Sequence, residues 1–260
     1  MDLKGTTDVG VREKRGSDMG RYDRQLIEFS QEEQARISKS TVGLVGCGGL
    51  GTSVSTALSM AGVGKLKIMD PDVPDITNLN RQFIYCETVL SGEEPHPKAD
   101  IMAEWIHKLN PDVDVVAKRS RFDEITWDFY DDCDVIVDCL DSIRYRLLVN
   151  KYCVEKGKPL VHGGISGFTG QLMTIIPGRT PCLNCILGSV PESSTPPASL
   201  GAIVMTIGSL EASEVLKLLI GRENDSAGIF NSFNFYSVRH TPISFERDPN
   251  CPICRHLYEK

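Results

Sequence analysis

The chain has 260 residues, of which 41% are hydrophobic and 24% charged, and this balance is that of an ordinary globular protein. Its formal net charge of −7 argues against a broad nucleic-acid-binding surface, and no apolar run reaches the roughly 18 residues of a membrane span. The start of the chain lacks the apolar core of a signal peptide, so we expect a soluble cytoplasmic protein whose nine cysteines are mainly reduced thiols.

The first 20 residues mix charges and glycines, which predicts a mobile tail. Ser30, with Glu33 three residues later, forms a capping-box pattern that predicts a helix over about 31–39. The short apolar run 42–45 then suits a buried strand of a parallel sheet.

A glycine-rich segment follows this strand and leads into a small-residue helix. Gly46, Gly48 and Gly51 have G-x-G-x-x-G spacing, and Gly49 lies between them. Glycines let a backbone approach phosphates closely, and the helix N-terminus that follows favours negative charge. Asp70 ends the next expected strand, where a carboxylate can bind ribose hydroxyls. The segment therefore predicts a nucleotide site, but it does not choose between NAD and ATP.

The residues after Asp70 favour ATP. The stretch "NLNRQF" supplies Asn78, Arg81 and Gln82, and Lys98 opens an amphipathic helix that should end near Leu109. Cations near a nucleotide bind polyphosphate oxygens and offset charge as a bond to phosphorus breaks. A dehydrogenase needs no such cluster beside its ribose-binding strand, and none of the five histidines lies in a convincing hydride-transfer motif.

Strands and helices alternate through the rest of the chain, which predicts a doubly wound, Rossmann-like, mostly parallel sheet. The strand in "CDVIVDCLD" delivers Asp138 and Asp141 to its carboxyl end. The other expected elements are a strand at 113–119, a helix capped by Ser142 and ending near Lys156, strands in "KPLVHGG" and "QLMTIIP", and a long apolar helix over 203–220.

We expect residues 21–260 to form a single ATP-binding domain. The range 188–201 is rich in proline and serine and is predicted to be a flexible crossover loop. The range 228–260 should add a small antiparallel extension and the second of two cysteine pairs.

Six stretches carry a family resemblance, from about Arg21 to the C-terminus: "RYDRQ", "GCGGLG", "MDPD", "NLNRQF", "HPKAD" and "DCLDS". In order and spacing they resemble the MoeB/ThiF/HesA adenylyltransferase branch of the ubiquitin-activating-enzyme-like superfamily. The resemblance implies an enzyme that activates the C-terminal glycine carboxylate of a small ubiquitin-like or sulfur-carrier protein, usually ending Gly-Gly. The product is an acyl-adenylate, and pyrophosphate leaves.

The resemblance also implies roles for the nucleotide-site residues. Asp70 would bind the ribose, and Asn78 and Arg81 would contact phosphates. Gln82 belongs to the same motif, while Lys98 would hold the triphosphate.

Two further roles follow from the same resemblance. Asp141 would coordinate magnesium, although a helix N-cap is the alternative, which neighbouring Ser142 could also provide. Arg24 looks like the arginine that relatives extend across a dimer into the partner's ATP site. This implies a homodimer, or a heterodimer with an inactive relative.

Four cysteines fall in two C-x-x-C pairs, which predict a structural Cys₄ zinc site that fastens the C-terminal segment to the domain. Redox activity of one pair and a zinc ligand at His256 are the alternatives. The four cysteines are Cys182, Cys185, Cys251 and Cys254.

One feature departs from the family pattern. Relatives often carry a thioester-forming cysteine in the loop before the last long helix, whereas "ESSTPPASLG" has no cysteine and places Ser193, Ser194 and Thr195 in that neighbourhood. We therefore expect the adenylate itself to be passed to a sulfurtransferase or a thiol acceptor protein.

The carrier tail is expected to thread near residues 163–170, where glycines permit close backbone approach. Adenylation of a transfer-RNA or peptide carboxylate, a non-catalytic subunit of a heterodimeric activating enzyme, and a nicotinamide dehydrogenase are the other readings. The carrier and the pathway stay open.

Overall fold

The computed structural model describes residues 20–90, 96–192, 195, 197–222 and 224–258. The tail predicted over 1–20 therefore lies outside the described residues except for Gly20. The same holds for residues 193, 194 and 196 of the predicted crossover loop.

Within the described residues, eight strands form one sheet in the order β3-β2-β1-β4-β5-β6-β7-β8. The first five strands of that order pair in parallel, and the last three are antiparallel to their neighbours. The strands are β1 Thr41–Val45, β2 Lys65–Met69, β3 Asp114–Lys118, β4 Val135–Asp138, β5 Leu160–Ser166, β6 Thr169–Ile175, β7 Ile229–Asn234 and β8 Arg239–Ser244.

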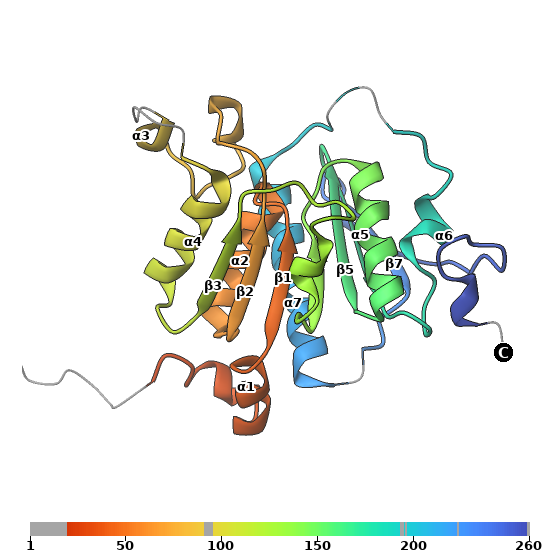
Figure 1. Ribbon diagram of the computed structural model, residues 1–260, viewed down its shortest axis with the longest axis horizontal. Helices are drawn as coiled ribbons and strands as arrows, with labels where there is room; N and C mark the ends of the chain where they lie inside the picture. Colours follow the sequence, from red (N-terminus) through yellow and green to blue (C-terminus); the bar gives the residue numbers. More distant parts are fainter. Residues whose placement is uncertain (1–19, 91–95, 193–194, 196, 223, 259–260) are drawn as a thin grey trace, which may run out of the picture.

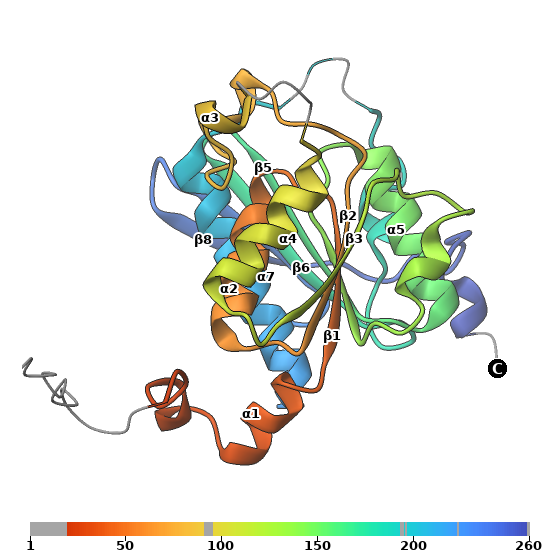
Figure 2. The same ribbon diagram turned by 60° about the vertical axis from the view of Figure 1, so that its left-hand side comes forward.

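Helices cover both faces of this sheet, as a doubly wound fold requires (Figure 1). Helices α2, α4 and α7 lie on one face and α5 lies on the other (Figure 2). The short α1 lies at the end of the sheet where the parallel strands begin. The helices are α1 Gln31–Ile37, α2 Gly49–Ala61, α3 Glu87–Leu90, α4 Lys98–Leu109, α5 Ile143–Lys156, α6 Leu183–Leu187 and α7 Gly201–Ile220.

The local signals in the sequence explain where the helices begin and end. At the start of α1 the Ser30 hydroxyl accepts from the Glu33 N–H at 3.2 Å, and the Glu33 carboxylate accepts from the Ser30 N–H at 2.8 Å, which completes the predicted capping box. Helix α2 ends at Gly62, whose φ of 82° is a left-handed C-cap that glycine adopts without strain.

The antiparallel half of the sheet is larger than the sequence indicates. Strands β5 and β6 form a hairpin whose turn contains Gly167 at a φ of 56°. The predicted C-terminal pair, β7 and β8, continues the same sheet from β6. Helices α3 and α6 are short and were not predicted. Among the described residues, no helix is long and apolar enough to span a bilayer.

Candidate active site

A cleft of about 390 Å³ opens at the carboxyl ends of the parallel strands, between β1 and β4. Strand order reverses there, so the crevice is the place where open α/β sheets bind ligands. Nine of the predicted site residues line the cleft, whereas Gly51 does not: Gly46, Gly48, Gly49, Asp70, Asn78, Arg81, Gln82, Lys98 and Asp141.

The glycines of the loop are needed because backbone crosses backbone. Gly46 has a φ of 101°, and a Cβ there would lie 2.8 Å from the Cys139 carbonyl oxygen. A Cβ on Gly51 would lie 2.2 Å from the Gly46 carbonyl oxygen. Gly48 is the N-cap of α2 and makes no side-chain cap bond, so N–H groups at this helix end remain available for an anion.

Asp70 holds the glycine loop in place. Its carboxylate accepts from the Cys47 N–H at 2.7 Å and from the Asp72 N–H at 2.8 Å. Burial raises the pKa of Asp70, and the two backbone N–H groups oppose that shift. Each carboxylate oxygen has a second lone pair, which leaves acceptors for a ligand in the cleft.

Three polar residues of the "NLNRQF" segment line the cleft, and their hydrogen bonds differ. The Asn78 side-chain oxygen accepts a hydrogen bond from the Asp75 N–H at 3.1 Å, and its amide nitrogen is left for a ligand. Arg81 donates to the Thr77 carbonyl at 2.8 Å. Gln82 is buried, and its amide oxygen has no hydrogen-bond partner within the described part of the chain. Such an unpaired buried amide fits a site that a polar ligand completes.

Lys98 begins α4 and is almost fully buried at the cleft wall. Its ammonium lies 3.6 Å from the exposed Asp72 carboxylate. The Tyr85 hydroxyl donates to the Cys47 carbonyl at 2.7 Å and so fixes the backbone of the glycine loop beside Lys98. The lysine is therefore held close to the glycine loop with one weak anionic partner.

Asp141 follows β4 and is exposed at the mouth of the cleft. No hydrogen-bond or ion-pair partner of its carboxylate occurs among the described residues. The Glu192 carboxylate, and not Asp141, accepts from the Arg144 N–H at 2.8 Å at the start of α5. Ser142 is the N-cap residue but makes no side-chain cap bond. The oxygen atoms of such a carboxylate suit a hard cation such as Mg²⁺.

A second groove of about 720 Å³ adjoins the cleft. Its walls include Gly164, Gly170 and Gln171 from the β5–β6 hairpin, within the range predicted for a carrier tail. The two cavities share four lining residues: Asp141, Arg146, Ile165 and Pro197. A group that enters along the groove would therefore meet the nucleotide cleft at Asp141.

Sequence reasoning missed several polar residues at this junction. Arg121 and Tyr145 line the cleft beyond Asp70 and are joined by a 3.0 Å hydrogen bond in which Arg121 donates. Arg146 lines both cavities, while His162 and Glu211 are completely buried behind them. The sequence indicates the place of Arg146 through one pattern: it lies four residues after Ser142, one turn into the predicted helix.

Glu211 in α7 is a completely buried acid. Neither carboxyl oxygen is hydrogen-bonded within the described residues, and a Cβ on Gly163 would lie 2.3 Å from its carboxyl carbon. Burial, and next the nearby Asp138 carboxylate, raise the pKa of Glu211 well above 4.5, so the acid is neutral over a wide pH range. Glu214, one turn along α7, differs: Thr174 and Asn224 donate to it at 2.7 and 3.0 Å, and Lys217 pairs with it.

We predict that Glu211→Gln stabilises the protein increasingly as pH rises. A raised pKa means that the folded state binds more protons than the unfolded state above about pH 4.5, so wild-type stability falls with increasing pH. The neutral amide removes this loss, and the stability difference should grow by up to about 1.4 kcal/mol per pH unit. Urea unfolding of both proteins between pH 5 and 8 measures it.

Glu214→Gln is the matched control. Although burial favours protonation, the bonds from Lys217, Thr174 and Asn224 lower the pKa of Glu214, so its stabilisation is present above the usual carboxyl pKa and is lost in acid. This variant should therefore be destabilised at neutral pH. A Glu211→Gln difference that stays flat with pH would show that Glu211 is ionised or exposed.

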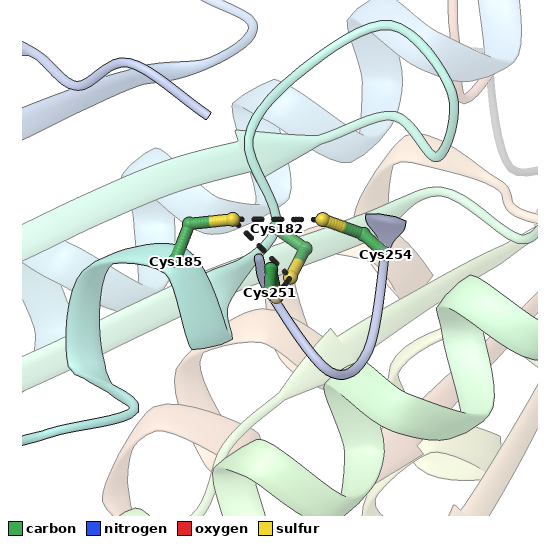
Figure 3. A group of neighbouring side chains, drawn as sticks. All are labelled: Cys182, Cys185, Cys251 and Cys254. Carbon is green, nitrogen blue, oxygen red and sulfur yellow. Dashed lines mark hydrogen bonds between the residues drawn. The ribbon is translucent and has the colours of Figure 1, made fainter. Parts of the chain in front are cut away.

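The two cysteine pairs meet in space. Cys182 and Cys185 lie at the start of α6, and Cys251 and Cys254 lie in the C-terminal segment, with all four thiols pointing to one centre (Figure 3). The four sulfur atoms lie within 4.8 Å of one another, at 3.5 to 3.9 Å for the three contacting pairs. A tetrahedron with zinc–sulfur bonds of about 2.3 Å has edges of about 3.8 Å, so the cluster fits zinc. His256 does not belong to it.

The cluster lies apart from the cleft, on the side of the sheet that carries α5. The Asn150 side chain of α5 accepts a hydrogen bond from the Leu183 N–H at 2.9 Å and so holds the segment that carries Cys182 and Cys185. The Tyr258 hydroxyl donates to the Thr180 carbonyl at 2.7 Å and holds the C-terminal segment. The cysteines are thus placed for a structural role.

Arg24 is exposed and does not line the cleft. Its neighbour Gln25 donates to the carbonyl of Ala61, the last residue of α2, at 3.0 Å. Helix α2 begins at the cleft, and 13 residues of helix span roughly 20 Å. The segment that carries Arg24 therefore lies at the opposite end of α2 from the glycine loop.

The chain has many relatives. It is 34% identical over 244 residues to the SAMP-activating enzyme E1 of Haloferax volcanii, covering 91% of this chain and 88% of the relative. It is 32% identical over 244 residues to the sulfur carrier protein ThiS adenylyltransferase of Escherichia coli strain K12, covering 91% and 95%. The fold is shared with a crystal structure of E. coli MccB with ATP, at a TM-score of 0.80 and 23% identity over 92% of this chain and 75% of that one.

The family model for the ThiF family matches residues 22–253, nearly the whole described chain. The match spans the glycine loop, the "NLNRQF" segment, Asp141 and three of the clustered cysteines, and the relatives include proteins named for ThiS and for HesA. The resemblance to the MoeB/ThiF/HesA branch is confirmed, and the chain belongs to the ThiF family.

Proposed function

We propose that this chain is an ATP-dependent adenylyltransferase that activates the C-terminal glycine carboxylate of a small ubiquitin-like or sulfur-carrier protein as an acyl-adenylate. One observation carries the proposal: a cleft built for a nucleotide meets a glycine-walled groove at Asp141. The α-phosphorus of ATP in the cleft and a carboxylate in the groove would come together at that junction.

The reaction needs positioning and charge and no nucleophile from the enzyme. A carrier carboxylate oxygen forms a bond to the α-phosphorus, and the bond to the bridging oxygen breaks as pyrophosphate leaves with the electron pair. Arg81, Lys98 and the N-terminus of α2 supply positive charge for the phosphates. Asp70 would bind the ribose through the lone pairs that remain after its two backbone bonds.

Asp141 would hold magnesium, which supplies neutralisation of phosphate charge when bound. The donor set fits, because the carboxylate lies at the junction without a competing partner among the described residues. Asn78 and Gln82 place further amide groups at the same cleft for the phosphates.

We infer that the adenylate leaves without an enzyme thioester. The crossover loop has no cysteine. The nearby buried thiols are poor nucleophiles, because burial raises the pKa of Cys47 and of Cys139 well above 9. A sulfurtransferase or a thiol acceptor protein is then the next partner, giving a thiocarboxylate or a conjugate. A four-cysteine metal site fits a reducing compartment such as the cytoplasm, which we propose as the location of the protein.

ATP–pyrophosphate exchange with magnesium, with and without candidate ubiquitin-fold proteins ending in Gly-Gly, tests the proposal. We expect exchange with one carrier and its loss when the last glycine of that carrier is deleted. Exchange driven by a peptide or a transfer RNA, or by no substrate at all, would refute the proposed substrate class.

We further propose that zinc occupies the four-cysteine cluster. Although burial opposes the thiolate, hydrogen bonds from the backbone N–H groups of Cys254 and Ile253 lower the pKa of Cys251 to about 7, which favours a metal ligand. Metal analysis of the purified protein is expected to give one zinc per chain, and Cys251→Ser should lose it and unfold more easily. A full complement of zinc in that variant would place the metal elsewhere.

We also propose a homodimer in which Arg24 completes the ATP site of the partner. Gln25 fixes this segment at the end of α2 that is remote from the cleft, which supports a role for Arg24 at the site of another subunit. The single-domain organisation over residues 21–260 accords with the continuous sheet and is part of the same proposal.

A further inference from the structure

The backbone that presents Asp141 is fixed by two buried side chains. Asp138 accepts a hydrogen bond from the Leu140 N–H at 3.1 Å, and the Arg146 guanidinium donates to the Leu140 carbonyl. Both backbone groups of the residue before Asp141 are therefore occupied. The Asp141 carboxylate has no partner of its own among the described residues, so its position is set by this backbone.

These two side chains are in turn held by β5. The Nδ1 atom of His162 lies 2.7 Å from the Asp138 carboxylate, and Arg146 also donates to the Gly163 carbonyl. The guanidinium of Arg146 lies 3.2 Å from Asp138 as well, so the carboxylate has a cationic and an imidazole partner. Asp138 and His162 are both completely buried.

A residue in the wall of the second groove contacts His162. The side-chain nitrogen of Gln171, which lines the second groove, lies 3.1 Å from Nε2 of His162. An amide nitrogen donates only, so Nε2 accepts and the neutral imidazole carries its proton on Nδ1, toward Asp138. Gly164 leaves room for this side chain, since a Cβ there would lie 2.5 Å from the Gln171 nitrogen.

We propose that Gln171, His162, Asp138 and Arg146 form a chain of positioning residues that sets the Asp141 carboxylate for divalent-cation binding from the wall of the groove. The inference rests on the proposed function for the meaning of the site, and it adds residues that act through Asp141 without touching the nucleotide. Partners of metal-binding groups commonly fix the orientation of the ligand itself.

A purely structural cluster would make a different prediction. If the four residues only joined β4, β5 and α5, replacing Gln171 at the groove would change stability at most. If they position Asp141, the same replacement weakens cation binding in a protein that is still folded.

The experiment compares the Mn²⁺ affinity of the ATP-bound protein among variants, measured from the EPR signal of free Mn²⁺ with protein in excess over ATP. Asp141→Ala defines how much of the affinity depends on this carboxylate. Gln171→Leu keeps the side-chain size but cannot donate to His162, and we expect about threefold to tenfold weaker Mn²⁺ binding. Asp138→Asn should weaken it by about 10- to 100-fold.

Met173→Leu is the matched control. Met173 lies two residues from Gln171 on β6 and pairs in register with His162, and its replacement alters core packing with no loss of a hydrogen bond. This variant should bind Mn²⁺ as the wild type does. Thermal unfolding of each variant separates a folding defect from a binding defect.

Wild-type affinity in Gln171→Leu, or equal weakening in Met173→Leu, would overturn the positioning role. An Asp141→Ala protein that binds Mn²⁺ as tightly as the wild type would overturn both this role and the magnesium part of the proposed function. The Mn²⁺ measurement needs no carrier protein. If the variants change Mn²⁺ affinity as expected but no carrier supports pyrophosphate exchange, the proposed substrate is wrong and the positioning role stands.

Discussion

Asp141→Ala is expected to lower ATP–pyrophosphate exchange by about a thousandfold while leaving the fold intact. A carboxylate that holds a cation against transferring phosphate contributes several kcal/mol to the transition state, and each 1.4 kcal/mol is a factor of ten in rate. The fold should survive, because Asp141 is exposed and is not hydrogen-bonded to any described residue. Exchange of radiolabelled pyrophosphate into ATP measures the loss.

Asp128→Ala gives the control, since this exposed acid lies in the short 3-10 helix Trp127–Tyr130 and does not line the cleft. It should exchange at the wild-type rate. Turnover by Asp141→Ala at more than about a tenth of the wild-type rate would remove Asp141 from the metal site and leave it as a solvated surface acid.

The Arg24→Ala homodimer is expected to exchange pyrophosphate about a thousandfold more slowly than the wild type. Mixing it with the Asp141→Ala protein should restore part of the activity. An arginine supplied in trans to transferring phosphate contributes at least this much in other enzymes. In a mixed dimer, the Arg24→Ala subunit keeps its own Asp141 and receives Arg24 from its partner, so one of the two sites is intact. Random mixing of equal amounts should restore about a quarter of the wild-type activity.

Mixing requires subunit exchange, so the two variants are best denatured and refolded together, with each variant treated alone as the control. Arg36→Ala tests for a general effect at the same end of the subunit, since Arg36 donates to the Ile220 carbonyl at 2.6 Å and lies away from the cleft. Activity that stays absent after mixing, while a dimer forms, would show that Arg24 does not act across the interface.

Most of the parallel half of the fold could be predicted because its signals are local. The helix over Lys98–Leu109 lies where the pattern places it, bounded by Pro97 and by Asn110-Pro111. The capping box of α1 is similarly confirmed. The β5–β6 hairpin could not be assigned a direction, because short, mostly buried strands have the same sequence pattern in a parallel or an antiparallel pair.

Within the candidate site, too, the residues that belong to local motifs could be predicted and the others could not. The glycine loop, Asp70 and Lys98 belong to contiguous motifs, and the structure brings them to one cleft. His162 and Glu211 belong to no motif, and their meaning depends on neighbours far away in the chain, with His162 24 residues from Asp138. A buried polar residue is recognisable only when the side chains around it are known.

The cysteine cluster has a consequence for the denatured state of the protein. It joins Cys182 to Cys251 and Cys185 to Cys254, each pair 69 residues apart, and the enclosed segment contains α7, β7 and β8. A cross-link that closes a loop of this length removes chain entropy worth about 4 kcal/mol from the unfolded ensemble. Zinc held there would therefore determine how much of the last third of the chain stays folded when metal is scarce, which would make the abundance of active protein depend on the cellular supply of zinc.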